Sequence, residues 1–173
     1  MLIEALIIDL SHDPFNPELN YMVALEYEKQ KQTASAVSFY LRTAEYGYAT
    51  HQEIVYSSLI RLAKCFEDQN DRLATVSNSL LQAVAYQPNR AEAYFWLSQF
   101  HERQKNWQEC YTFACIGLSL DKDNDYRLTF EKAVSAWWIG RSEESKVLFN
   151  KLLLRTDVTP EYRKVIEANL ASI

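Results

Sequence analysis

The fold is decided by residues 91–124, which read AEAYFWLSQFHERQKNWQECYTFACIGLSLDKDN. Two runs of helix-forming residues flank a polar turn, and apolar residues recur in them at spacings of three and four. In the first run, Tyr94, Leu97, Phe100 and His101 share one stripe. Such spacing puts these side chains on one face of a helix. The stretch is therefore predicted to form two antiparallel helices joined by a short turn.

The same arrangement recurs along the chain, because polar or Gly- and Pro-containing breaks separate apolar-periodic segments of helix length. Asn89 and Thr159 are predicted to cap the helices that follow them, with Pro160 at the first helical position. No segment alternates as a strand would. The expected elements are an opening helix at 2–11, helix pairs at 17–31/33–47, 53–69/71–86, 91–105/107–120 and 125–139/142–155, and a last helix at about 161–171.

Composition excludes several classes of protein. Only 3 of the 173 residues are Gly and 4 are Pro, which argues against glycine-rich phosphate loops and turn-dense β-sandwiches. With 18 basic and 23 acidic residues the net charge is −5, so no nucleic-acid partner is expected. No apolar run reaches the roughly 18 residues of a membrane span. The opening MLIEALIIDL lacks a basic flank and a cleavage site, so it is not predicted to be a signal peptide.

Cysteines and histidines are assigned structural roles. Cys65, Cys110 and Cys115 are odd in number and lie in apolar helical runs, so they are predicted to be small buried hydrophobes of a cytoplasmic protein. The three histidines are scattered, and His101 is predicted to be a hydrogen-bonded residue between helices. Glu26/Glu28 and Glu143/Glu144 are interpreted as solvated helix faces. No catalytic residue and no cofactor site is predicted, so the protein is not expected to be an enzyme.

One segment imitates a calcium loop, with Asp121, Asp123 and Asp125 at its first, third and fifth places. Its sixth place is Tyr126, where a sharp turn requires Gly, and its twelfth is Lys132, where a bidentate Glu is needed. The same acids suit a turn that caps the following helix. We therefore predict no metal site.

The 34-residue pair at 91–124 resembles a tetratricopeptide repeat (TPR), with Asn106 and Trp107 at the turn and Ala114 and Gly117 where small residues are needed. Small residues let antiparallel helices approach closely. The resemblance implies an all-α, right-handed α-solenoid (a superhelix) forming one domain over 1–173. Repeats are expected at about 17–50, 53–88, 91–124 and 125–157. The opening helix and a C-terminal helix at 160–171 would cap the array.

A narrower resemblance involves three short segments: AYQPNRAE at 85–92, WIGRSEES at 138–145, and PEYR at 160–163 with the residues that follow it. They are similar to the TPR region that follows family 2 glycosyltransferase catalytic domains. That family's sugar-transferring core is a separate α/β domain with a metal-binding Asp-x-Asp motif, and we expect none in this chain. The resemblance implies a link to glycan assembly, with a glycosyltransferase as partner.

In TPR arrays the first helix of each pair lines a concave groove. Aromatic and cationic side chains in such a groove suit a peptide segment or a glycan. The alternative for Trp96, Trp137 and Trp138 is packing between repeats or against the last helix. Aligned with the repeat, the groove positions are Tyr21, Met22, Leu25, Arg61, Lys64, Phe95, Trp96, Gln99, Glu102, Arg103, Phe130, Glu131, Val134, Trp137 and Trp138.

Three hypotheses for function follow. The first is a non-catalytic interaction module that holds a protein segment in the groove. The second is an accessory part of a glycosyltransferase that contacts acceptor sugar. The third is a self-associating scaffold, a homodimer formed through the opening helix with its residues Leu2, Ile3, Leu6, Ile7 and Leu10.

Overall fold

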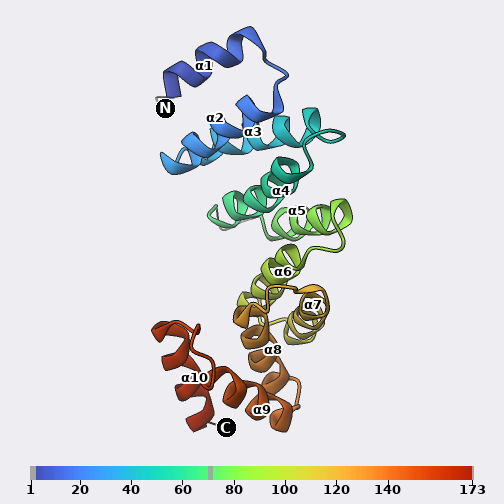
Figure 1. Ribbon diagram of the computed structural model, residues 1–173, viewed down its shortest axis with the longest axis vertical. Helices are drawn as coiled ribbons and strands as arrows, with labels where there is room; N and C mark the ends of the chain where they lie inside the picture. The colour runs from blue at the N-terminus through green and yellow to red at the C-terminus, as the bar shows by residue number, and fades with distance from the viewer. Residues whose placement is uncertain (1–2, 70–71, 173) are drawn as a thin grey trace. The chain divides into compact units, whose positions relative to one another are not determined.

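The computed structural model describes residues 3–69 and 72–172, and every regular element in this part of the chain is an α-helix (Figure 1). None of these described helices combines the length and the apolar character that crossing a membrane requires. The chain divides into two compact units, unit 1 (Met1–Pro88) and unit 2 (Asn89–Ile173). The division falls at the end of the second predicted repeat. That the whole chain is one domain stays a prediction.

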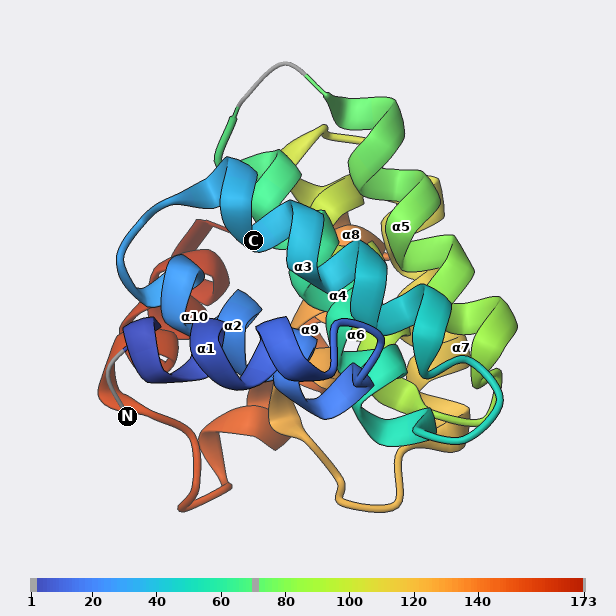
Figure 2. The same cartoon turned by 90° about the horizontal axis from the view of Figure 1, so that it is seen from above.

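Unit 1 contains two antiparallel helix pairs and a leading helix. The leading helix lies against the first pair (Figure 2). Its Leu6 and Leu10 form a buried cluster with Val23 of that pair. The predicted start of this helix at Leu2 lies outside the described residues. The helices are α1 (Ile3–His12), the pair α2 (Pro17–Lys29) and α3 (Thr33–Tyr46), and the pair α4 (Gln52–Glu67) and α5 (Leu73–Tyr86).

Unit 2 repeats this plan with the extra helix at its C-terminal end. Phe130, Phe149 and Ile166 come from three successive helices and form its last core cluster. The extra helix therefore covers the apolar side of the last pair. The helices are the pair α6 (Ala91–Arg103) and α7 (Trp107–Leu120), the pair α8 (Tyr126–Trp138) and α9 (Ser142–Leu153), and α10 (Pro160–Ser172).

Small residues lie where the helices of each pair meet, as the repeat pattern predicts. Gly117 illustrates the reason, since a Cβ at this position would lie 2.7 Å from Leu128 Cδ2 and 3.2 Å from Tyr94 Cβ. Larger side chains would force these helices apart. The residues of the pattern that the structure buries are Ala24, Ala36, Ala63, Ala83, Ala114, Gly117, Ala133, Ala136 and Ser145.

The turns inside three of the pairs share one backbone geometry. Lys31, Lys105 and Gly140 have φ of 60°, 57° and 83°, in the left-handed region. The following amide in each turn donates to a carbonyl five residues back, as in Gln32 to Tyr27 at 2.9 Å. The left-handed residue and its hydrogen bond end each helix before the polar turn. Helices α2, α6 and α8 therefore end one or two residues earlier than predicted, at Lys29, Arg103 and Trp138.

Helix starts are partly as predicted. The Asp125 carboxylate accepts the Arg127 amide at 2.9 Å and caps α8, and Pro160 is the first residue of α10. The prediction that Asn89 caps the next helix was wrong. Helix α6 begins at Ala91, so its capping position is Arg90, and the Arg90 side chain makes no capping bond. The start predicted at residue 71 lies outside the described residues.

Candidate functional site

The groove residues predicted in unit 1 come from α2 and α4. Tyr21 is half-buried, and its hydroxyl hydrogen-bonds the Ser57 hydroxyl at 2.7 Å. Met22 is exposed, and Leu25 and Lys64 are half-buried. Tyr21 and Ser57 therefore join the two helices directly, which leaves Met22 as the most exposed of these predicted positions.

Arg61 belongs to an internal network that the sequence prediction missed. One guanidinium nitrogen lies 2.9 Å from both carboxylate oxygens of Glu28. The hydroxyl of fully buried Tyr40 donates to the same carboxylate, and burial followed by this bond raises the Tyr40 pKa. Arg61 is thus not an unpaired groove cation, and Glu28 is not simply part of a solvated face. The network ties α2, α3 and α4 together.

Two aromatic residues assigned to the groove of unit 2 belong to its core instead. Phe95 is 4% exposed and Phe130 is 8% exposed. The Phe95 ring lies under the Arg127 guanidinium, 4.5 Å from its centroid, and the Phe130 ring contacts Tyr162 of α10 at 4.9 Å. Repeat alignment gives the direction of a side chain, but neighbouring helices decide whether it is covered. Neither ring can offer a partner much surface.

Other predicted residues of α6 remain on the surface of unit 2. Trp96 is half-buried and contacts the Phe95 ring edge-on at 5.1 Å. Arg103 is exposed, with one guanidinium nitrogen 3.5 Å from the half-buried Gln99 side-chain oxygen. Their role in binding stays a prediction.

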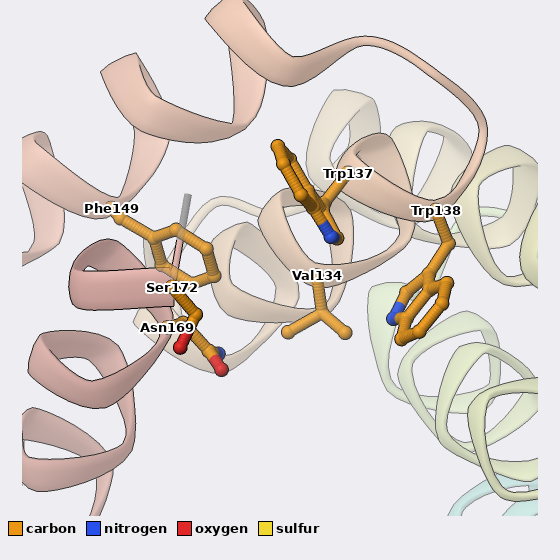
Figure 3. Close-up of a pocket in the computed structure, with 6 residues that line it drawn as sticks. All are labelled: Val134, Trp137, Trp138, Phe149, Asn169 and Ser172. Atoms are coloured by element: carbon orange, nitrogen blue, oxygen red, sulfur yellow. The ribbon is translucent and has the colours of Figure 1, made fainter.

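A hollow of about 270 Å³ lies between α8 and α10. Figure 3 shows Val134 between the α8 tryptophans on one side and the polar tips of Asn169 and Ser172 on the other. Trp138 is 59% exposed. The hollow therefore combines an apolar floor, indole walls and amide and hydroxyl groups. Its lining residues are Val134, Trp137, Trp138, Phe149, Asn169 and Ser172.

Trp138 is held in place by a residue outside the predicted groove. Its ring stacks on Trp107 of α7, with centroids 5.0 Å apart and planes inclined by 10°. The alternative role considered for Trp138, packing against other helices, therefore holds for one face of its ring. Much of the side chain is still exposed. Trp107, Asn169 and Ser172 were not predicted as site residues. They are far from α8 in the sequence, and nothing in the sequence pattern indicates that they contact it.

Glu131 has a different environment from the other groove positions. It is 1% exposed, and burial and the negative charge of Glu102 raise its pKa to about 8. Burial also raises the pKa of Glu102. The raised pKa favours the uncharged form of Glu131 at neutral pH.

The acidic turn before α8 uses its carboxylates internally. Asp121 accepts the amide of Asp123 at 3.0 Å and also the amide of Asp125. Asp125 pairs with Arg127. These contacts are those of a turn and helix cap, as the sequence predicts. In residues 3–69 and 72–172 no group of three or more His, Cys, Asp or Glu side chains is arranged to hold a metal ion.

His101 packs between α6 and α7, with its ring stacked 5.3 Å from Phe113. Its buried Nδ1 has no hydrogen-bond partner among residues 3–69 and 72–172, so the hydrogen bond expected there is not found at this atom. Burial lowers the His101 pKa. Cys65 and Cys110 are buried as predicted, and Cys115 is half-buried. Burial raises the pKa of Cys65 to about 11 and of Cys110 to about 12, which makes both thiols unreactive.

Solved structures place this helix-pair architecture among known folds. A structure of MamA matches with a TM-score of 0.73 and 17% identity over 87% of this chain and 84% of that one. YrrB, described as a TPR protein with an unusual peptide-binding site, matches with a TM-score of 0.70 and 13% identity over 96% and 81%. The chain has the TPR fold.

A third structure extends this TPR likeness. PilW, a type IV pilus biogenesis factor, matches with a TM-score of 0.76 and 15% identity over 94% of this chain and 73% of that one. No family model matches the sequence, and no curated protein matches it. At these low identities the likeness establishes the TPR fold.

Proposed function

We propose that this TPR chain is a non-catalytic protein-interaction module that holds a segment of a partner protein at the hollow between α8 and α10. The observation that carries the proposal is the exposed Trp138 ring, braced by Trp107 beside an apolar floor. A rigid aromatic residue supplies contact area with little loss of conformational entropy. The peptide-binding site named for YrrB supports a peptide as ligand.

The chemistry of the hollow defines the segment it suits. An apolar side chain of the partner would lie on Val134 against the indoles, while Asn169 and Ser172 bond its main-chain amide and carbonyl groups. The resemblance of segments 85–92, 138–145 and 160–163 supports a partner in glycan assembly, such as a glycosyltransferase. The three unpaired cysteines support a reducing, cytoplasmic location.

Affinity capture from a lysate of the source cells, followed by titration of each purified candidate, tests this proposal. We expect Trp138→Ala and Asn169→Ala to weaken binding by at least about tenfold, because each removes one side of the hollow. Tyr48→Ala is the matched control, since it removes an exposed aromatic ring from unit 1. Equal affinity of all three variants for the partner would place the binding surface elsewhere.

A sugar is the second candidate ligand for the hollow. An indole face beside an amide and a hydroxyl is also suited to an uncharged sugar ring, which corresponds to the accessory-subunit hypothesis. Titration with neutral oligosaccharides, followed by tryptophan emission, distinguishes the two. A response to sugar that Trp138→Ala abolishes, without any peptide ligand, would favour the sugar.

Self-association through α1 is supported by a separate observation. Leu6 and Leu10 are buried against α2, whereas Ile7 is exposed and Ile8 is 59% exposed. These isoleucines give α1 an uncovered apolar face. Sedimentation of the wild type and of Ile8→Glu tests it: a dimer that the substitution dissociates supports self-association, and a wild-type monomer contradicts it.

A further inference from the structure

Glu131 is a buried acid at the place where three helices of unit 2 meet. Its carboxyl and its backbone carbonyl lie 4.0 Å and 3.9 Å from the Cys110 thiol of α7. Ser135 donates a hydrogen bond of 2.7 Å to the same carbonyl, and the Gln99 side chain of α6 bonds the carboxyl group. Glu131 is thus enclosed by α6, α7 and α8, the three helices whose close approach forms the first half of unit 2.

In the part of the chain that the structure describes, no cation pairs directly with this carboxyl group. Among the described residues Glu131 forms no ion pair within 4.0 Å. On α6 the charge of Glu102 opposes its ionisation, whereas the Gln99 bond and then the charge of Arg103 favour it, without outweighing burial. Cys110 of α7 is a neutral thiol, because its pKa is raised by burial.

The described residues of α9 and α10 supply no counter-charge to Glu131 either. Tyr162 of α10 has a raised pKa, because of burial and then the effect of Glu131. Glu144 of α9 pairs with Lys132 at 2.8 Å, so the lysine next to Glu131 in sequence is already engaged. A buried carboxylate without a paired cation is strongly disfavoured, so close packing of the three helices favours the protonated acid.

We propose that Glu131 is a proton-operated lock on the contact between α6, α7 and α8, which we call the seam. The protonated carboxyl group lets these three helices pack closely around it, and ionisation of the group loosens the seam. This inference does not depend on the proposed function. Val134 and Trp138 follow Glu131 on α8, and both line the hollow. The lock therefore acts on the helix that carries these lining residues.

The sign of the effect follows from proton linkage. The pKa of Glu131 is about 8 in the closed unit and takes the ordinary value of 4.5 when the seam opens. The closed form therefore binds more protons, and opening becomes easier as pH rises between these values. From these two pKa values, proton linkage predicts that the equilibrium constant for opening of the seam rises about fivefold from pH 7 to pH 8. From pH 8 to pH 9 the same constant rises less than about twofold.

Amide hydrogen exchange resolved to single helices tests the lock in the full chain. Protection factors, corrected for the pH dependence of chemical exchange, would be measured for α6, α7 and α8 at pH 7, 8 and 9. We expect protection in the wild type to fall about fivefold and then to level off. In Glu131→Gln, which is neutral at every pH, it should stay constant. Glu143→Gln, an exposed acid on α9, is the matched control and should behave as the wild type.

A second variant keeps the test decisive if Glu131→Gln fails to fold. Glu102→Gln removes the neighbouring negative charge, which lowers the Glu131 pKa and makes the fall between pH 7 and pH 8 smaller. A flat wild-type profile would overturn the proposal. So would the same fall in Glu131→Gln, or an equal fall in the helices of unit 1, since each would assign the effect to another group.

Discussion

Gly117 shows how one residue controls the packing of unit 2. Its missing Cβ leaves room for Leu128 and Tyr94, as the distances of 2.7 Å and 3.2 Å indicate. We expect Gly117→Ala to destabilise unit 2 by about 1–2 kcal/mol, because an overpacking cost of about 1–3 kcal/mol exceeds the gain in helix propensity. Urea unfolding followed by tryptophan emission measures this change. Ser119→Ala, at an exposed position of α7, is the control, and a more stable Gly117→Ala would contradict the packing argument.

His101 is a second residue whose environment makes a prediction. Because burial lowers its pKa, the folded protein favours the neutral ring, so the stability it contributes is present above pH 6.5 and lost as pH falls. His101→Phe keeps the ring on Phe113 and removes the unpaired Nδ1. We expect it to match the wild type within about 1 kcal/mol at pH 7 and to be the more stable protein at pH 5. Urea midpoints at both pH values decide this, with His12→Gln as an exposed control.

At the scale of the element, α8 depends on its cap. The Asp125 carboxylate accepts a hydrogen bond of 2.9 Å from the Arg127 amide. Burial raises the Asp125 pKa, but the bonds to Arg127 lower it by more, so the pKa is lowered overall. We expect Asp125→Ala to cost about 1 kcal/mol and Asp125→Asn less, because asparagine can still cap a helix. Urea unfolding monitored by tryptophan emission compares the two. An Asn variant as unstable as the Ala variant would assign the effect to the lost charge.

Turn geometry marks the limit of reading helix ends from sequence. Glycine at residue 140 signals a left-handed turn, and the structure has one there. Lys31 and Lys105 adopt the same conformation without any such signal. The repeat alignment could have identified them, because all three occupy the same place in their pairs. Residue identity alone could not, since lysine has no preference for this region.

At the scale of the whole molecule, the four tryptophans at 96, 107, 137 and 138 all belong to unit 2. Tryptophan emission therefore reports on unit 2, while circular dichroism reports on both units. We expect the free energy of unfolding by emission to fall by about 1 kcal/mol from pH 7 to pH 8, as Glu131 must lose its buried proton. Glu131→Gln should remove the fall. A rise in stability over this range would show that another group dominates.

The candidate site was only partly predictable. Trp138 follows from the repeat register, which places it on the inner side of its helix. Trp107 and Asn169 do not, because they reach the hollow through the packing of α7 and α10. Phe95 and Phe130 were placed in the groove by the same register and are buried. A register states which way a side chain leaves its helix, and the neighbouring helices determine what then covers it.

The all-helical architecture, the helix pairs and the small residues between them were predictable without the structure. These features follow from local periodicity and from side-chain volume, both of which are properties of short segments. Which side chains remain accessible could be seen only from the packed helices, and so could the pairing of Arg61 with Glu28 and the lack of an ion pair at Glu131 within the described part of the chain. Burial and charge pairing depend on residues far apart in the chain, and their energies change steeply with separation and solvent access.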